Sequence, residues 1–527
     1  MSENAFDECE ATLGEDSSAK EMLRCVVSIL NTAQSNNDAV AFSRLHFLLH
    51  SAILVFLMQA GFAMLAAGSV RMKNVGNTML KNLLDACGAS IAYFAIGYAL
   101  SLGGDDPRSS RKTFIGTTGF FLQNVNDDKL AEWTFQFAFA ATATTIVAGA
   151  LAERCKMIAY LSYSFLLVGF VYPVIVHAFW SSHGYLSGKA VDPLLGVGTL
   201  DFSGSGVVHL TGGYVALIST KILGPRKGRF HDDSGRALDK PKKMPGHSIA
   251  LQMLGCMLLW VGWFGFNIGT VLTLDTPDGP RLASVVAVNT ALSAGMGGLS
   301  ALFLNLLIVE RLTGEAQFDL HFVMNGTLSG AVAITGGCSL VEPWAAVIIG
   351  FIAGICFILG HHLVLRLRID DCVDAIAVHM VNGIWGLISV GLFASPARIM
   401  QTYGRSDHVG FLLSFSHNGA DGILLLTQFI GIFFILAWVT VTMFPFFIWL
   451  DWKGWFRSDP LEELVGLDIS YHGGCALGKD VQPDYITVRS LGSLESRQNQ
   501  FPSSVCNSET PPTPECDTAP WESAIPM

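Results

Sequence analysis

Long apolar stretches separated by short polar loops dominate the pattern of hydrophobic and polar residues along this chain. A helix needs about 20 mostly apolar residues to cross a bilayer core of roughly 30 Å. Transmembrane strands are shorter and alternate apolar with polar residues, which these stretches do not. We therefore predict an all-α, polytopic membrane protein with eleven transmembrane helices, at His46–Val70, Met79–Leu102, Trp133–Leu151, Met157–Phe179, Phe202–Ile222, Ser248–Val271, Leu282–Val309, Leu320–Cys338, Trp344–Leu365, Cys372–Phe393 and Ile423–Leu450.

The composition supports a membrane protein. Of the 527 residues, 51% are hydrophobic and 14% are charged, whereas roughly a quarter are charged in soluble domains. The 54 Gly residues suit tightly packed membrane helices, because small residues let helix backbones approach closely. The net charge of −11 does not suggest nucleic acid as a partner, and membrane lipids are the expected surroundings.

The basic residues of the short loops predict the orientation, because loops rich in Lys and Arg stay in the cytoplasm. The most basic loop follows the fifth span, and the loops an even number of spans away also carry cations. The N-terminus is therefore predicted outside and the C-terminus inside. We divide the chain into an extracellular arm (1–45), a membrane domain (46–450), a cytoplasmic regulatory tail (451–489) and a disordered tail rich in Ser, Pro and Thr (490–527).

The N-terminal arm is polar, and no signal peptide is evident in it. It contains Cys9 and Cys25. In an extracellular arm these two thiols could form a disulfide, including one between subunits.

A short repeat relates the fifth and tenth spans. Asp201 precedes His209 by eight residues, Asp371 precedes His379 by eight, and a Gly follows each His four residues later. The two spans are an odd number apart, so two five-span halves insert with opposite topology. Inverted repeats are a transporter architecture, in which the functional site lies where the halves meet, near the midplane.

The two histidines are the strongest candidates for a functional site. Ionisable residues inside spans are rare and usually face the bundle interior or a cavity. Each could instead pack against a backbone carbonyl, but matching positions in both halves favour a functional pair. Facing imidazoles can donate and accept hydrogen bonds along a path for a small molecule, or relay a proton.

Acidic residues precede both histidines. Asp201 is expected to cap the start of the fifth span, and its carboxylate also lowers the cost of a cation nearby. Asp371, or Asp374 closer to His379, is the equivalent candidate in the tenth span.

Aromatic residues supply a further element. Trp180 ends the fourth span on the predicted outer side, Phe139 lies in the third span and Phe266 in the sixth. Aromatic faces attract cations. A single Phe in a span more often faces lipid or core, and a Trp at a span end is more often an interfacial anchor.

Four motifs taken together resemble the ammonium transporter family, and most closely its plant- and algal-type branch. They are D-F-S-G-S-G-V-V-H (Asp201–His209), G-A-L-A-E-R (Gly149–Arg154), W-F-G-F-N (Trp263–Asn267) and D-A-I-A-V-H (Asp374–His379). The resemblance runs from the first span through the first half of the C-terminal tail. It implies an eleven-helix bundle with an inverted five-plus-five repeat, assembled as a homotrimer with one pore per subunit in the plasma membrane.

The resemblance also implies residue roles. By it, Trp180 matches the tryptophan of an outer recruitment site, Phe139 and Phe266 a stacked phenylalanine gate, Asp201 the carboxylate that shapes the entry, and His209 and His379 the paired pore histidines. Asp371 looks like the counterpart of Asp201. Thr270 stands where the family usually has a serine that binds ammonium, so the hydroxyl is kept while the affinity could differ.

The tail motif G-L-D-I-S-Y-H-G-G (Gly466–Gly474) resembles a cytoplasmic segment in which a kinase can phosphorylate a hydroxyl residue to close the pore. Ser470 occupies that position, unless it is an ordinary surface serine. The alternatives to an ammonium transporter are a Rhesus-type channel for ammonia or carbon dioxide, an ammonium sensor with little flux, and a membrane enzyme. No catalytic motif or metal-ligand cluster is evident, so we expect neither an enzyme nor a cofactor.

Overall fold

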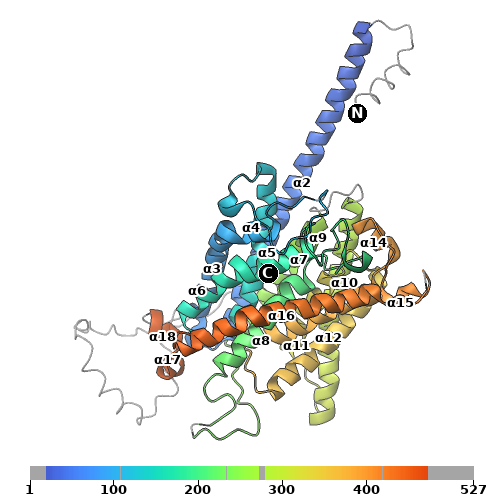
Figure 1. Ribbon diagram of the computed structural model, residues 1–527. Coiled ribbons are helices and arrows are strands. Elements are labelled where there is room, and N and C mark those ends of the chain that lie inside the picture. Colours follow the sequence, from blue (N-terminus) through green and yellow to red (C-terminus); the bar gives the residue numbers. More distant parts are fainter. Residues whose placement is uncertain (1–18, 107, 233, 272–278, 418, 473–527) are drawn as a thin grey trace, which may run out of the picture. The chain divides into compact units, whose positions relative to one another are not determined.

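The computed structural model describes residues 19–106, 108–232, 234–271, 279–417 and 419–472. These residues form helices and loops, with isolated β-bridges and no β-strand among them (Figure 1). The α-helices are α2 (Ala19–Ser69), α3 (Val75–Ala92), α4 (Tyr98–Leu102), α5 (Leu130–Ala150), α6 (Met157–Leu166), α7 (Tyr172–Trp180), α8 (Thr211–Leu223), α9 (Ile249–Val271), α10 (Gly279–Thr313), α11 (Leu320–Thr335), α12 (Pro343–Arg366), α13 (Asn382–Phe393), α14 (Pro396–Tyr403), α15 (Phe411–Ser414), α16 (Ile423–Trp452), α17 (Pro460–Val465) and α18 (Leu467–His472). Four π-helical segments, η2 (Tyr93–Gly97), η5 (Leu167–Val171), η7 (Ser205–Leu210) and η8 (Ile376–Val381), continue directly into α-helices.

The predicted all-helical membrane fold is confirmed, while the count of eleven spans stays a prediction. Every predicted span is helical in the structure, and nine helices among the described residues are long and apolar enough to cross a membrane. The other two predicted spans are α5 and α11. Every residue from Ala138 to Ala150 in α5 and from Met324 to Thr335 in α11 is buried. These two helices therefore face protein, where polar residues such as Thr, Ser and Asn are tolerated. Helix α11, with 16 residues, is also shorter than the nine.

The first helix is longer than its predicted span. Helix α2 has 51 residues, so the part of the predicted arm that the structure describes continues the first span as one helix. Cys25 in this helix is disulfide-bonded. Cys9 and the predicted disordered tail 490–527 lie outside the described residues, so the predictions about them stay open.

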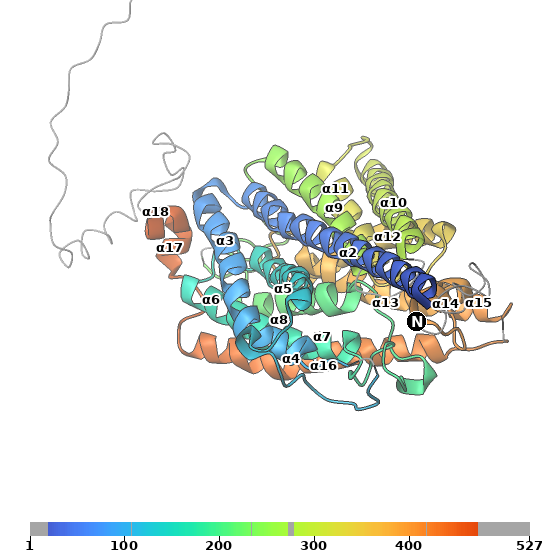
Figure 2. The same cartoon turned by 90° about the horizontal axis from the view of Figure 1, so that it is seen from above.

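Helices from both halves of the sequence pack together around the repeat. Helix α2 lies lengthwise against α9 and also contacts α5, as Figure 2 shows. Helices α10, α11 and α12 form a second group, and α16 packs against α8 and α13. The elements η7 and η8, one from each half, meet in the middle of these contacts.

The two glycines of the sequence repeat lie where the halves cross. A Cβ on Gly213 of α8 would stand 2.3 Å from the backbone nitrogen of Met380 in η8. A Cβ on Gly383 of α13 would stand 2.6 Å from the carbonyl oxygen of Ser205 in η7. Each glycine thus lets its helix approach the histidine-bearing element of the other half to backbone contact.

Buried ion pairs join the loops on the predicted cytoplasmic side. Arg226 makes two hydrogen bonds to the Asp370 carboxylate, at 2.8 and 2.9 Å, and a third to Glu153 at 2.7 Å. Burial by itself raises the pKa of Asp370, but the hydrogen bonds and charge of Arg226 outweigh it and hold that pKa well below its usual range. This network fixes the loop that leads into η8.

Replacing Gly213 by Ala is expected to destabilise the crossing, because the new methyl group overlaps backbone atoms that cannot move independently. Overpacking of this kind costs about 1–3 kcal/mol, so the melting temperature of the detergent-purified protein should fall. Gly295→Ala in α10 is the matched control, since a Cβ there meets nothing within 4 Å. Equal melting temperatures for the two variants would contradict this account of the crossing.

Candidate functional site

The two predicted histidines face each other inside the protein. His209 of η7 and His379 of η8 have ring centroids 5.2 Å apart and nearly parallel rings, and both are buried. Neither ring nitrogen of His209, nor Nδ1 of His379, has a hydrogen-bond partner among the described protein groups. Because buried polar groups almost always have partners, these nitrogens are suited to a small guest that exchanges hydrogen bonds.

The acidic residues of the repeat anchor both histidine elements in the same way. One carboxylate oxygen of Asp201 accepts hydrogen bonds from the backbone N–H groups of Gly206 and Val207, at 2.9 and 2.8 Å. Asp371 accepts one from the N–H of Ile376 at 2.8 Å, at the same offset of five residues. Each carboxylate binds free N–H groups at a helix start. The capping expected for Asp201 is therefore observed, and Asp371 has the equivalent position in the second half.

An unbroken row of rings leads from Trp180 to the histidines. The Trp180 and Phe139 centroids are 5.9 Å apart, and Phe139 and Phe266 stack at 3.8 Å. Phe266 is 5.6 Å from His209. The indole of Trp180 is fixed by a 2.7 Å hydrogen bond that its Nε1 donates to the carbonyl oxygen of Asp201. The structure thus brings the predicted aromatic residues together on one side of the histidine pair.

A cavity of about 290 Å³ opens on the Trp180 side. Its walls include Trp180, Phe139 and Thr270, together with the carboxylate of Glu132. The Thr270 hydroxyl donates a hydrogen bond to the carbonyl oxygen of Phe266 at 3.0 Å, so it lies at the base of this cavity next to the phenylalanine stack. The cavity combines aromatic faces and a hydroxyl, which are groups that bind a small cation, with both acidic (Asp105, Glu132) and basic (Arg44, Lys129, Lys189) side chains.

A second, much smaller cavity of about 20 Å³ touches His379 from the other side. It also borders Thr145 and Gly149 of α5, whereas the larger cavity borders Glu132 and Phe139 of the same helix. Thr145 and Phe139 are six residues apart, or about 9 Å along a helix. The stacked phenylalanines and the histidine pair therefore separate two cavities at different depths.

Several residues of this region were not predicted from the sequence. Trp263 stacks on His209 with a centroid distance of 5.3 Å. Its spacing of three residues from Phe266 places both on one helix face, a signal already present in W-F-G-F-N. Phe62 of α2 lies 6.2 Å from the His379 ring, and nothing in the sequence of the first span marks it.

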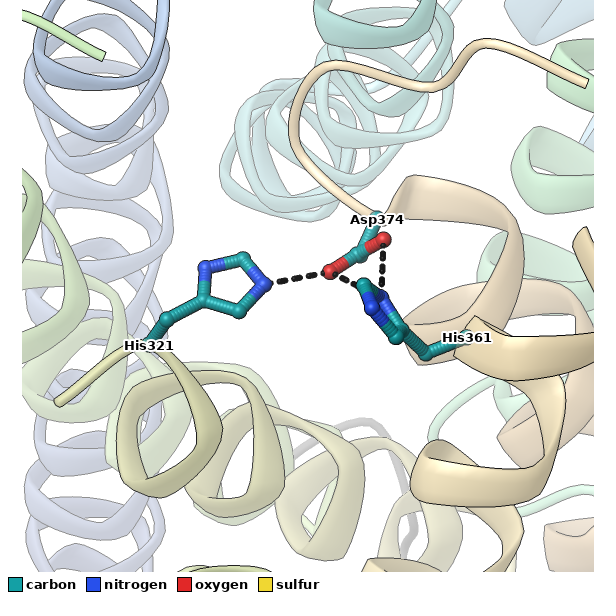
Figure 3. Close-up of side chains that lie close together, drawn as sticks. All are labelled: His321, His361 and Asp374. Carbon is teal, nitrogen blue, oxygen red and sulfur yellow. Dashed lines mark hydrogen bonds and ion pairs between the residues drawn. The ribbon is translucent and has the colours of Figure 1, made fainter. Parts of the chain in front are cut away.

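Asp374 occupies a different environment from the one expected. It is paired with His321 and His361, as Figure 3 shows, while Asp371 alone takes the position equivalent to Asp201. These three residues could hold a metal ion, an arrangement that was not expected from the sequence. The histidines stand 53 and 13 residues before Asp374, so no local motif could have revealed the cluster.

Ser470 lies exposed in α18, a short helix that packs on the start of α3. The carboxylate oxygens of Asp468 accept hydrogen bonds from the backbone N–H groups of Gly76 and Asn77, at 2.9 and 2.7 Å. The side-chain oxygen of Asn74 accepts one from the N–H of Leu467 at 2.9 Å. The tail is thus capped onto α3, with Ser470 two residues beyond the principal contact.

A family model and named relatives match this sequence over most of its length. The family model described as Ammonium Transporter Family matches residues 46–477. Ammonium transporter 1 member 3 of Solanum lycopersicum is 41% identical over 86% of this chain and 96% of its own length. Ammonium transporter Amt2 of Archaeoglobus fulgidus is 40% identical over 84% of this chain and 89% of its own length.

Solved structures agree with the sequence relatives. A protein titled Sensor Amt Protein superposes with a TM-score of 0.68 at 29% identity, covering 82% of this chain and 99% of that one. Mep2 of Candida albicans superposes with a TM-score of 0.67 at 26% identity, covering 80% and 87%. The sequence match over most of the chain and the shared helical fold lead to one conclusion: this protein is a multi-pass membrane protein that belongs to the ammonium transporter family.

Proposed function

We propose that this protein transports ammonium across the plasma membrane, recruiting the cation in the larger cavity and conducting ammonia past His209 and His379. The observation that carries the proposal is the buried imidazole pair, which stands between two cavities and has three ring nitrogens without a hydrogen-bond partner among the described residues. A wholly structural pair would be expected to satisfy its nitrogens with protein groups.

Recruitment takes place at the aromatic wall of the larger cavity. Cation–π attraction to Trp180 contributes about 0.5–2 kcal/mol, depending on how far the cation is desolvated. The Thr270 hydroxyl offers an oxygen acceptor at this cavity. Glu132 also lines it, paired with Lys129 at 2.7 Å. Ammonium can donate hydrogen bonds to such acceptors, whereas potassium has no donor and no proton to release.

Passage then requires the phenylalanine stack to open. With centroids 3.8 Å apart, the rings of Phe139 and Phe266 are in van der Waals contact, so a hydrated cation cannot pass between them. Deprotonation before the stack leaves neutral ammonia, for which an apolar passage costs far less than it does for a charge. Beyond the stack, the imidazole nitrogens supply the hydrogen bonds that ammonia loses on leaving water. The proton either returns outward or follows through the histidine pair.

Two further features are proposed from the family. The subunits assemble as a homotrimer, each with its own pore, and the chain lies with its N-terminus outside the plasma membrane.

Docking of the tail supports transport because it holds the loops next to η8. Glu463 of α17 accepts hydrogen bonds from the backbone N–H of Lys227 at 2.6 Å and from Arg457 at 2.7 Å. Lys227 directly follows Arg226, which is paired with Asp370.

The test of the proposed function is methylammonium uptake by vesicles that contain the purified protein. His209→Ala should lower uptake about tenfold, because losing a hydrogen bond in a dry passage costs about 1–3 kcal/mol. His417→Ala, an exposed loop histidine, should leave uptake unchanged.

The same assay decides between the proposed transporter and its alternatives. One structural relative is titled a sensor, and a sensor with little flux would give no uptake above protein-free vesicles, which would refute the proposal. A Rhesus-type gas channel would show uptake that follows ammonia and does not saturate with ammonium. Potassium flux equal to ammonium flux would also refute the proposed ammonium transporter.

Trp180→Leu should raise the ammonium concentration for half-maximal uptake by roughly 2- to 30-fold, which is the cation–π contribution expressed as a ratio. The matched control is Trp344→Leu, because Trp344 is half exposed near the start of α12 and does not border the larger cavity. An unchanged half-maximal concentration in Trp180→Leu would show that recruitment does not depend on the indole.

Phosphorylation of Ser470 by a kinase is proposed to release the tail. A phosphate adds roughly −1.5 to −2 charge, two residues from Asp468 and beside a helix that already carries acidic groups. Ser470→Asp should therefore lower uptake several-fold, while Ser470→Ala should keep it. Asp468→Ala removes the cap on α3 and should reproduce the effect of Ser470→Asp. Normal uptake in both Ser470→Asp and Asp468→Ala would contradict a regulatory tail.

A further inference from the structure

Two histidines and one aspartate from three separate elements converge on the predicted cytoplasmic side. His321 lies in the first turn of α11, His361 near the end of α12, and Asp374 just before η8. Figure 3 shows both imidazoles turned toward the same carboxylate. None of the three takes part in the proposed passage of ammonia.

The distances within this cluster are short. Nε2 of His321 is 2.6 Å from Oδ2 of Asp374, and Nδ1 of His361 is 2.9 Å from Oδ1 and 3.0 Å from Oδ2. One ligand atom from each residue lies within 4.8 Å of the others. In a tetrahedral site with bonds of about 2.1 Å, ligand atoms stand about 3.4 Å apart. The cluster can therefore enclose an ion through shifts of less than about 1 Å in each ring.

The donor set selects the type of ion. Two imidazole nitrogens with one carboxylate suit Zn²⁺ and neighbouring divalent transition metals, with one or more positions left for water. Mg²⁺ and Ca²⁺ prefer oxygen ligands throughout. The Asn325 amide donates to Oδ2 of Asp374 at 3.3 Å, which orients the carboxylate as an outer partner does in metal sites.

An ion can reach the cluster. The side chain of His321 is 36% exposed and that of His361 is 17% exposed, while Asp374 lies deeper at 8%. The histidines thus form an accessible rim above a buried carboxylate.

We propose that His321, His361 and Asp374 form a binding site for a divalent ion of the zinc class, and that occupancy of this site slows transport. The second part rests on the proposed function. Asp374 has a backbone φ of 56°, a conformation that is uncommon for a residue with a side chain. Its carbonyl oxygen accepts the N–H of Val378 at 2.9 Å, one residue before His379.

Two physical effects connect the ion to the pore. Asn325, which contacts Asp374, also borders the smaller cavity, as do Ala375 and His379. A bound ion would tie α11 and α12 to the segment that begins η8 and so restrict movement of His379. It would also place positive charge beside the inner cavity, where it repels any cation that forms or leaves there.

Binding is tested first and does not depend on transport. The full chain, purified in detergent with a tag that contains no histidine, is titrated with Zn²⁺ by calorimetry and with Co²⁺ by visible absorption. The wild type should bind one ion at this site and gain several degrees in melting temperature. His321→Ala and His361→Ala should each lose this ion and the gain in melting temperature. Without metal, both variants should melt at about the same temperature as the metal-free wild type.

The control is His362→Ala. His362 is the next residue on α12, its side chain is exposed, and its nitrogens are not part of the cluster. This variant should bind Zn²⁺ as the wild type does. Undiminished binding in His321→Ala or His361→Ala, or equal loss in His362→Ala, would overturn the site.

Transport is then measured in vesicles with Zn²⁺ on the side of the tail. Zinc should lower methylammonium uptake at least fivefold in the wild type and in His362→Ala, but not in His321→Ala. Zinc that binds without slowing uptake would overturn the regulatory part. A wild type that binds zinc but never takes up methylammonium would refute the proposed function and leave the metal site standing.

Discussion

The close crossing of two helices at Gly213 and Gly383 is the constraint on which the rest of the structure depends. A side chain at either position would collide with the backbone of the other half. Contact at this distance brings His209 and His379 to a centroid separation of 5.2 Å, deep among buried apolar residues. The small residues at the crossing therefore let the backbones come close enough to place the two histidines side by side.

This arrangement has an electrostatic cost that the fold meets in two ways. The starts of η7 and η8 lie inside the protein, and their free N–H groups are bound by Asp201 and Asp371. In the loops, the buried charge of Arg226 is paired with Glu153 and Asp370. Along the proposed passage the described side chains between the two cavities are the stacked rings and the two imidazoles. These groups suit a small polar guest and oppose an ion that must shed its water.

The predicted cytoplasmic face concentrates every proposed means of control. The tail binds the start of α3 through Asp468, and the ion-pair network holds the loop before η8. The cluster of His321, His361 and Asp374 holds the segment that follows this loop. The ion-pair network and the cluster both act on the few residues that precede His379, and the tail reaches the network through Glu463, which accepts the N–H of Lys227 next to Arg226. A change in tail docking or metal occupancy would therefore reach the proposed pore by a short path.

The sequence by itself determined the membrane class, the positions of the helices and the paired motif, because hydrophobic length and the spacing of Asp, His and Gly are local properties of the chain. It also pointed to Trp180, Phe139 and Phe266 as candidate site residues, although only through resemblance to a family, because single aromatic residues in spans have no distinctive spacing. Only the tertiary structure showed that Trp263 and Phe62 flank the histidines, and that α5 and α11 are buried enough to carry polar residues. It alone brought His321 and His361 to Asp374, because residues 53 and 13 positions away become neighbours only when three separate elements pack at one end of the bundle.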